Sequence, residues 1–200
     1  MNLTKRQQAL LIGTILGDGY LQKTGERNAR LRLEHGGKQK EYLLWKAQQF
    51  TRFFSGAPEE IARFHPGTKK TYTYWRWQSH ASPELGKWRT RFYMNGVKHI
   101  PETLGKLLRD PLSLAVWYMD DGYYSQEQKH SFIYLGRVSR TEADIAQKTI
   151  ADNFGIVSRV YDKKEKGFAL FFSVVETKKF HALVREHIVP SMAYKLSLTP

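Results

Sequence analysis

The nine residues LAVWYMDDG (114–122) form an apolar run that ends in two carboxylates and a glycine. Asp110 and Pro111 precede the run, and they are an N-cap residue followed by the residue type that suits a first helical turn. The stretch therefore predicts a helix over residues 111–121. Carboxylates at a helix C-terminus are electrostatically unfavourable, because the helix macrodipole is already negative there. A cation bound beside Asp120 and Asp121 would relieve that repulsion.

A second stretch of the same kind, LIGTILGDG (11–19), lies near the N-terminus. When the two stretches are aligned, Asp18 falls on Asp121, and the repeat lies about half of the 200-residue chain away. That spacing predicts an internal duplication. Two helices that each bring one carboxylate to a common point would form a metal site on a pseudo-twofold axis. The alternative is that each Asp-Gly pair is only a helix-ending turn, and two copies in register make this reading the weaker one.

The composition indicates a polyanionic partner. Net charge is +13, from 32 Lys and Arg against 19 Asp and Glu, which favours nucleic acid over membrane, with a merely basic soluble protein as the alternative. Cysteine is absent, so disulfides and thiolate metal sites are excluded. No apolar run reaches membrane-spanning length, and the start MNLTKR lacks a signal-peptide core. We therefore expect a soluble intracellular protein.

Hydrophobic periodicity and capping signals predict one order of elements twice: helix, strand, strand, helix, strand, strand, helix. In the first half the expected elements are a helix over 4–17, strands over 20–24 and 30–34, a helix over 38–54, a hairpin turning at 66–70 with its return strand over 72–78, and a helix over 83–93. In the second half they are the helix over 111–121, strands near 123–126 and 131–138, a helix over 139–154, strands over 156–162 and 167–175, and a helix over 177–188. We expect an N-terminal half over 1–93, a connecting segment over 94–110 and a C-terminal half over 111–200.

The two acidic stretches resemble the two name-giving motifs of the LAGLIDADG homing endonucleases in their single-chain form. FYMNGVKHIP (92–101), a leucine-rich spacer before DPLSLAVWYMDDG (110–122), and VPSMAYKL (189–196) are similar to the intron-encoded branch of that family. The resemblance covers essentially the whole chain. It implies an α+β fold of two pseudo-symmetric αββαββα halves, whose two curved antiparallel sheets form a DNA-binding saddle for the major groove.

The resemblance also implies an activity, which is cleavage of both strands of DNA at a long, asymmetric site to leave short 3′ overhangs. It identifies Asp18 and Asp121 as the metal-binding acids, and Lys98 and Lys195 as basic residues beside the scissile phosphates. The implied ion is Mg²⁺, with Mn²⁺ as a substitute, and Ca²⁺ is expected to bind without supporting cleavage. Hydrolysis needs an attacking water and charge neutralisation, both of which divalent ions supply.

The second motif departs from the first at two positions of the helix. Val116 stands where the first motif has Gly13, and Asp120 stands where it has Gly17. The two helices therefore cannot make a symmetric glycine-on-glycine contact. The backbone carbonyls of Gly17 and Asp120 are candidate additional metal ligands. Of the two adjacent acids, we expect Asp121 to reach the metal.

Strand alternation selects the side chains that would contact DNA, since arginine and glutamine can read guanine and adenine edges. These side chains are Tyr20, Gln22, Arg30, Arg32, Glu34, Tyr72, Tyr74, Arg76, Gln78, Tyr123, Ser125, Tyr134, Arg137, Arg159 and Tyr161. Parity is less clear in the second half, because Phe132 and Tyr134 fall on the face opposite Ile133 and Leu135. The lysines at the hairpin turns are expected to contact phosphates. They are Lys69, Lys70, Lys163, Lys164 and Lys166.

The remaining histidines and large aromatics are expected to be structural. No ligand spacing connects His35, His65, His80, His99 and His130, and Trp45, Trp117, Phe154 and Phe172 fit a hydrophobic core. Two other functions compete with the endonuclease. One is an RNA maturase that binds intron RNA, and the other is a DNA-binding regulator without catalysis, which would have no reason to retain both acids and both lysines. We expect a free-standing or intron-encoded monomer rather than an intein, located in the cytoplasm or nucleoid, or in an organelle matrix if the gene is organellar.

Overall fold

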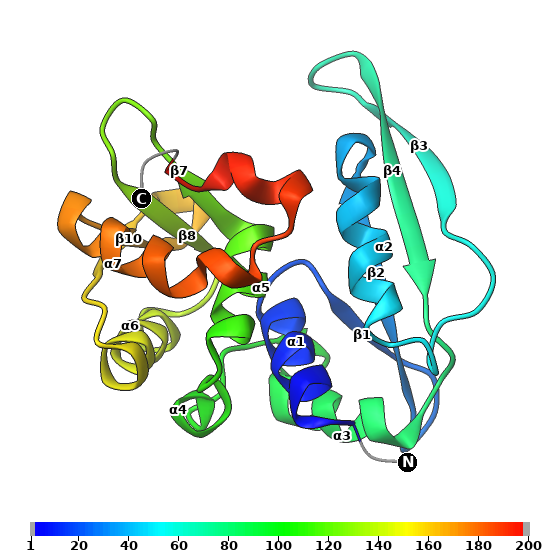
Figure 1. Ribbon diagram of the computed structural model, residues 1–200. Coiled ribbons are helices and arrows are strands. Elements are labelled where there is room, and N and C mark those ends of the chain that lie inside the picture. The colour runs from blue at the N-terminus through cyan, green and yellow to red at the C-terminus, as the bar shows by residue number, and fades with distance from the viewer. Residues whose placement is uncertain (1–2, 198–200) are drawn as a thin grey trace. The chain divides into compact units, whose positions relative to one another are not determined.

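Two sheets of the same topology show the duplication in three dimensions (Figure 1). The computed structural model describes residues 3–197. One sheet has the strand order β1-β2-β4-β3 and the other β7-β8-β10-β9, and the neighbouring strands of both are antiparallel. Strand for strand, the second sheet repeats the first. The expected α+β class and the order αββαββα in each half are confirmed.

The first half and the segment after it contain the expected elements and an additional hairpin. Their bounds are α1 (Lys5–Leu16), β1 (Tyr20–Lys23), β2 (Ala29–Gly36), the 3-10 helix η1 (Gly37–Gln39), α2 (Lys40–Gln48), β3 (Glu59–His65), β4 (Lys70–Gln78), α3 (Pro83–Phe92), β5 (Tyr93–Met94), β6 (Val97–Lys98) and α4 (Leu104–Leu107). The helix α2 packs on the β2 and β4 part of its sheet. On that face Leu31 and Leu33 are buried, as the strand alternation predicts.

The second half repeats the series and ends in short 3-10 turns. Its bounds are α5 (Pro111–Asp121), β7 (Gly122–Tyr124), β8 (Ser131–Gly136), α6 (Arg140–Phe154), β9 (Arg159–Asp162), η2 (Lys164–Lys166), β10 (Phe168–Phe172), α7 (Val174–Val184), η3 (Arg185–His187) and η4 (Pro190–Lys195). The helices α6 and α7 both contact β10. Among residues 3–197, we find no helix with the length and apolar character needed to cross a membrane.

The chain forms two compact units that divide it differently from the expected halves. One unit consists of the residues up to Gln7 together with Asp18–Arg91, and the other of Gln8–Gly17 and the chain from Phe92 onward. Most of α1 therefore packs in the same unit as α5. The boundary after Arg91 lies close to the expected end of the first half.

Capping chemistry explains the helix starts that the sequence predicts. Asp110 accepts a hydrogen bond from the Leu112 amide at 2.9 Å, which caps α5. Ser139 and Glu142 form a reciprocal capping box at the start of α6. This helix ends at Gly155, whose φ of +66° is the left-handed conformation typical of a glycine C-cap.

Two helix boundaries and the connecting segment differ from the predictions for local reasons. The helix predicted over 38–54 ends at Gln48, because the Phe50 and Phe53 amides bond three residues back in turns instead of continuing α2. The last helix begins at Val174 rather than 177, because Ser173 caps it. In the connecting segment, an Asn-Gly turn with φ of +52° and +82° joins β5 to β6, and this hairpin and α4 were not predicted.

Candidate active site and nucleic-acid interface

The two lysines singled out in the sequence each reach the C-terminal end of a motif helix. Lys98 donates from Nζ to the carbonyl oxygen of Gly17 at 2.5 Å, just beyond the end of α1. Lys195 donates from Nζ to the carbonyls of Met119 at 2.6 Å and Asp120 at 3.0 Å, at the end of α5. An ammonium group at a helix C-terminus is stabilised by the unpaired carbonyls and by the macrodipole. The two lysines therefore take equivalent places at the two motif helices.

The contact between α1 and α5 is asymmetric, as the two departures in the second motif predict. A Cβ on Gly13 would lie 2.2 Å from the Ser113 carbonyl oxygen and 2.8 Å from the Val116 Cβ. A Cβ on Gly17 would lie 2.4 Å from an Asp120 carboxylate oxygen. Glycines on α1 thus leave room for larger residues on α5. The Asp120 carboxylate consequently lies beside the backbone of Gly17, the residue bonded to Asp18.

The two carbonyls expected as additional metal ligands already accept hydrogen bonds. The Gly17 oxygen accepts from Lys98 and the Asp120 oxygen accepts from Lys195. A carbonyl oxygen has two lone pairs, so each could still bind a second group. A cation on the same oxygen would lie close to an ammonium group, which is unfavourable. The side-chain carboxylates are therefore the better metal ligands at these helix ends.

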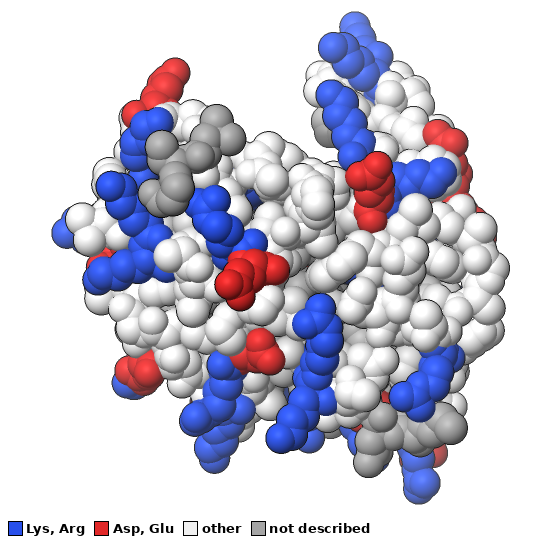
Figure 2. Space-filling model, viewed as in Figure 1, with Lys and Arg blue, Asp and Glu red and all other residues white. Residues whose placement is uncertain are grey.

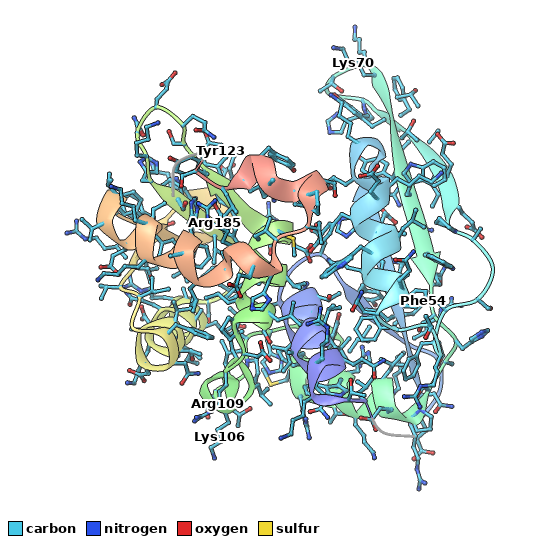
Figure 3. The ribbon with its side chains drawn as sticks, viewed as in Figure 1. Phe54, Lys70, Lys106, Arg109, Tyr123 and Arg185 are labelled. Atoms are coloured by element: carbon cyan, nitrogen blue, oxygen red, sulfur yellow. The ribbon has the colours of Figure 1, made fainter. Side chains whose placement is uncertain are left out.

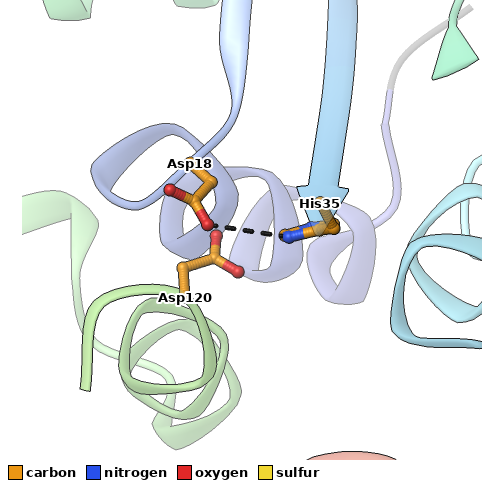
Figure 4. Close-up of side chains that lie close together, drawn as sticks. All are labelled: Asp18, His35 and Asp120. Atoms are coloured by element: carbon orange, nitrogen blue, oxygen red, sulfur yellow. Dashed lines mark ion pairs between the residues drawn. The ribbon is translucent and has the colours of Figure 1, made fainter. Parts of the chain in front are cut away.

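Asp18 is approached from within its own unit by two buried basic side chains that the sequence did not single out. His35 Nδ1 lies 3.6 Å from Asp18 Oδ2 (Figure 4), and Lys46 Nζ lies 3.3 Å from His35 Nε2. An ammonium group only donates, so Nε2 accepts and the Nδ1 proton faces the carboxylate. His35 and Lys46 are buried, whereas the Asp18 side chain is 46% exposed. The Lys46–His35 pair thus contacts Asp18 from the buried side, while the Asp18 side chain keeps about half of its surface exposed.

The signal for His35 was present in the strand pattern. It follows Leu31 and Leu33 on the inward face of β2, so its burial was predictable and agrees with the expected structural role. Its position beside Asp18 was not predictable, because it depends on the register in which β1, the strand after Asp18, pairs with β2.

The exposed face of the first sheet contains the polar side chains that the alternation selects. Cross-strand pairs such as Tyr20–Arg32 and Arg32–Gln78 show that they share one face. The side chains on this face are Tyr20, Gln22, Arg30, Arg32, Glu34, Tyr72, Tyr74, Arg76 and Gln78. Arg63, on β3, belongs to the same face and was not predicted. Side chains must lie on the same face of a sheet if they are to contact the same DNA groove.

An ion cluster orders the arginines at the centre of this face. The Glu34 carboxylate accepts from Arg63 Nη1 at 2.5 Å and from Arg76 Nε at 2.7 Å. Partial burial opposes ionisation of Glu34, but the hydrogen bonds and charges of the two guanidinium groups outweigh it and lower the pKa of the carboxyl. Glu34 is thus an internal counter-ion for the two arginines, and its expected contact with DNA stays a prediction.

The corresponding face of the second sheet is aromatic. Tyr123 pairs with Phe132, and Phe171 pairs with both Phe132 and Arg159, so these four share a face. Tyr134 lies two residues after Phe132 on β8, and Tyr161 lies two residues after Arg159 on β9. Both tyrosines pair with Ala169 of β10. The strand pairing resolves the parity that was unclear in the sequence. Phe132 and Tyr134 lie on the same face as Tyr123 and Tyr161.

Two of the residues selected in the second half lie outside the exposed strand face. Ser125 is buried in the turn after β7, where its hydroxyl accepts from the Gln128 amide at 3.2 Å. Arg137 follows β8 and donates to the Glu165 carbonyl at 3.2 Å, which connects it to the β9–β10 turn. The sequence selected both residues because it extends the two strands to 126 and 138, whereas β7 ends at Tyr124 and β8 at Gly136.

Basic side chains mark the hairpin turns of both sheets. Lys69 and Lys70 lie at the turn between β3 and β4, where Figures 2 and 3 show a basic tip. Lys164 and Lys166 are exposed in η2 between β9 and β10. Lys163 differs from these, because its Nζ lies 4.4 Å from the centre of the Phe132 ring.

A buried polar network holds the backbone of Lys195. The Tyr118 hydroxyl donates to the Lys195 carbonyl at 2.7 Å. It also lies 3.1 Å from His181 Nε2. The Ser197 amide donates to His181 Nδ1 at 3.0 Å, so the neutral imidazole carries its proton on Nε2. A helix residue of the second motif thus positions the lysine that returns to the end of the same helix.

This network predicts acid sensitivity. Burial, with a smaller contribution from the charge of Arg185 (labelled in Figure 3), lowers the pKa of His181 from 6.5 to about 4. The unfolded chain therefore binds the extra proton first, and stability falls as the pH drops from about 6.5 to 4, by about 3 kcal/mol in total. The pKa of the neighbouring Tyr118 is raised by burial, so that hydroxyl stays neutral. Urea unfolding at several pH values measures the loss.

His181→Gln is the control, since an amide does not titrate. Its unfolding free energy should depend less on pH between 6.5 and 4 than that of the wild type. Equal slopes would show that His181 is not the titrating group. Glu34, Glu142 and Glu176 also have lowered pKa values, but theirs lie below 4.5 and affect a more acidic range.

Comparisons with known proteins agree with this architecture. The model of the LAGLIDADG DNA endonuclease family matches residues 8–180. The chain is 31% identical over 210 residues to Protein RecA of Mycolicibacterium fallax, covering 97% of this chain and 47% of that protein. It is 29% identical over 199 residues to probable intron-encoded endonuclease 1 of Wickerhamomyces canadensis, covering 97% and 85%. The chain thus spans about half the length of the RecA relatives that it matches.

A solved structure supports the fold across the whole chain. The homing endonuclease I-WcaI, bound to its DNA recognition sequence, matches with a TM-score of 0.91 at 25% identity. The match covers 100% of this chain and 89% of that one. The expected fold is therefore confirmed at the level of the whole domain.

Proposed function

Because the chain belongs to the LAGLIDADG DNA endonuclease family, we propose that it is a monomeric, site-specific endonuclease that cuts both strands of duplex DNA. The cut would leave short 3′ overhangs at a long, asymmetric target. The observation that carries the proposal is the equivalent placement of Lys98 and Lys195 at the ends of the two motif helices. Asp18 and Asp121 stand at corresponding positions of those motifs. A protein that only bound DNA would not need paired acids and paired lysines there.

The donor set suits a hard divalent cation. Asp18 and Asp121 supply carboxylate oxygens, which Mg²⁺ prefers, and neither side chain is fully buried. Asp120 would add a third carboxylate beside Gly17. When bound, the ion would neutralise phosphate charge and make a bound water more acidic. Mn²⁺ would substitute, and Ca²⁺ would bind without supporting cleavage.

The chain's own groups would act on the phosphate and on the acids. Lys98 and Lys195 would stabilise the negative charge that develops on the phosphate oxygens. Their carbonyl contacts hold each ammonium group in place before the substrate arrives. The Nδ1 proton of His35 would orient the Asp18 carboxylate toward its ligand.

The two strand faces would contact the major groove. Arginines and glutamines on the first sheet would read base edges, and the lysines at the hairpin turns would contact phosphates. The charge of +13 supports this partner. Intron RNA is the second candidate ligand, and a competition between duplex DNA and intron RNA at matched salt would distinguish an endonuclease from a maturase.

The decisive experiment incubates the protein with a large random duplex library and Mg²⁺ and sequences every new end. The wild type should give one recurrent site with a staggered cut, and Asp121→Asn should give none. Asp120→Asn tests which adjacent acid matters, because only the essential acid should abolish cutting. Absence of a recurrent site with the wild type, despite tight and salt-sensitive binding, would refute the endonuclease and favour the maturase or the regulator.

Lys163 offers a test of the phosphate contacts. Lys163→Met should weaken binding to all duplex sequences and reduce the slope of log K against log salt by about one, since one fewer counterion is released. Binding titrations on specific and random duplexes over a range of salt concentrations measure both effects.

The matched control for this prediction is Lys148→Met. Lys148 is exposed on α6 in an ion pair with Asp152, and its loss should leave the salt slope unchanged. If Lys163→Met altered discrimination at one base position only, Lys163 would contact a base and not a phosphate.

A further inference from the structure

The two sheet faces differ in chemistry although their topology is the same. On the first face the arginines are ordered by polar partners. Arg30 donates to Gln22 at 3.0 Å, and the Glu34 carboxylate binds Arg63 and Arg76. Arginine held in a fixed orientation suits paired hydrogen bonds to the guanine edge. The first face is therefore built for hydrogen-bonded recognition.

The second face is built from rings that support one another. Phe132 lies with its ring centre 6.0 Å from those of Tyr134 and Tyr161 and 5.2 Å from that of Phe171. Phe132 is buried, while Tyr123, Tyr134 and Tyr161 are 50%, 42% and 43% exposed. Mutual packing orders the rings, so the face presents an aromatic surface whose exposed part is formed by the three tyrosines.

Few charged groups interrupt this surface. Arg159 is the cross-strand partner of Phe171. The Lys163 Nζ lies 4.4, 5.9 and 5.8 Å from the ring centres of Phe132, Tyr134 and Tyr161. In the proposed complex this ammonium group contacts a phosphate, which uncovers the three rings. The Tyr134 hydroxyl stays neutral, since burial, and to a lesser extent Tyr123, raises its pKa. Compared with the first face, the second has far fewer donors with which to read a base edge.

The major groove contains one apolar group that such a surface can recognise. Thymine carries a C5 methyl there, and apolar side chains contact it favourably, whereas guanine and cytosine present only donors and acceptors. Pressing rings against those edges would leave polar groups desolvated and unpaired, which is unfavourable. An aromatic face therefore discriminates in favour of thymine.

We propose that the sheet β7-β8-β10-β9 selects its half of the DNA target through thymine methyl groups, which contact the Phe132–Tyr134–Tyr161 surface. The half-site of the first sheet is instead selected by arginine hydrogen bonds. The target is thus asymmetric in composition, with one half-site rich in A·T pairs. This inference rests on the proposed function and specifies its substrate.

The test replaces thymine by deoxyuridine, which removes only the methyl group, in one half-site of the recovered target at a time. Binding is measured at fixed salt for the wild type, Tyr134→Ser and Gln22→Ala. For the wild type, substitution in one half-site should weaken binding about fourfold for each contacted methyl, and substitution in the other should have little effect. Tyr134→Ser should reduce that sensitivity, and Gln22→Ala, on the first face, should preserve it.

The outcomes separate this inference from the function on which it rests. Equal sensitivity in both half-sites, or no sensitivity in either, would overturn the inference while leaving the endonuclease intact. Equal sensitivity of the wild type and Tyr134→Ser would also overturn it, because the methyl groups would then contact another surface. If no duplex were cut or bound specifically, the proposed function and this inference would fail together. Tyr134 is exposed on its strand, so its replacement should not prevent folding.

Discussion

Asp18→Asn should reduce the rate of DNA cleavage on the order of a thousandfold or more, while the affinity for the target changes little. The substitution keeps the shape of the side chain but removes the negative charge that would hold a divalent cation, and electrostatic groups of this kind contribute at least two to three orders of magnitude. Asp18 is half-exposed and held on one side by His35, so its replacement should not unfold the protein. Single-turnover cleavage of the recovered target, with excess enzyme, measures the rate.

The matched control for this experiment is Asp152→Asn. Asp152 is an exposed acid on α6, paired with Lys148, and its loss should leave cleavage at the wild-type rate. If Asp18→Asn also cut at the wild-type rate, Asp18 would not be a metal ligand of the reaction. If both the affinity and the rate of Asp18→Asn fell together, Asp18 would contribute to binding more than to chemistry.

Gly13→Ala should lower the free energy of unfolding by about 3 kcal/mol, the upper part of the range for overpacking in a core. The new methyl group would lie 2.2 Å from a backbone oxygen of Ser113 and 2.8 Å from the Val116 side chain. Backbone cannot rotate away as a flexible side chain does, so α1 and α5 would have to separate. Urea unfolding followed by circular dichroism measures the change.

Gly105→Ala is the control for the glycine prediction, because it makes the same substitution within a helix of the same unit. A Cβ at Gly105 would have Thr149 Oγ1 at 3.8 Å as its nearest neighbour, an ordinary contact. Alanine there should be neutral or slightly stabilising, since it restricts the unfolded chain. Equal stability of Gly13→Ala and the wild type would mean that the two helices do not approach as closely as described.

The sequence predicted most of the fold because local chemistry determines where elements begin and turn. Capping residues such as Asp110 and Ser139 accept hydrogen bonds from amides two or three residues along the chain. The structure confirms both caps. Strand alternation likewise predicted the leucine face of β2. Predictions were wrong where two local signals competed, as at Ser173, where a helix cap follows directly after a β-strand.

The site was less predictable, because its contacts join residues far apart in the chain. The motifs identified Lys98 and Lys195, but they could not show that each lysine bonds to carbonyls at the end of a motif helix. Lys46 was missed, since a buried lysine has no periodic signature. For His35 the strand pattern predicts burial but not the position beside Asp18. Which of Asp120 and Asp121 binds a metal stays a prediction, although the Asp120 side chain is the one beside Gly17.

The assignment of Gln8–Gly17 to the same unit as the second half of the chain has a consequence for biosynthesis. A nascent chain emerges from the ribosome at about 5–20 residues per second. Lys98 follows its hydrogen-bond partner Gly17 by 81 residues, and Ser113, against which Gly13 packs, is made later still. For several seconds the apolar side of α1, with Ile12 and Ile15, has no partner and is exposed to non-native association. The burial of α1 therefore waits until α5, which lies far along the chain, has been translated.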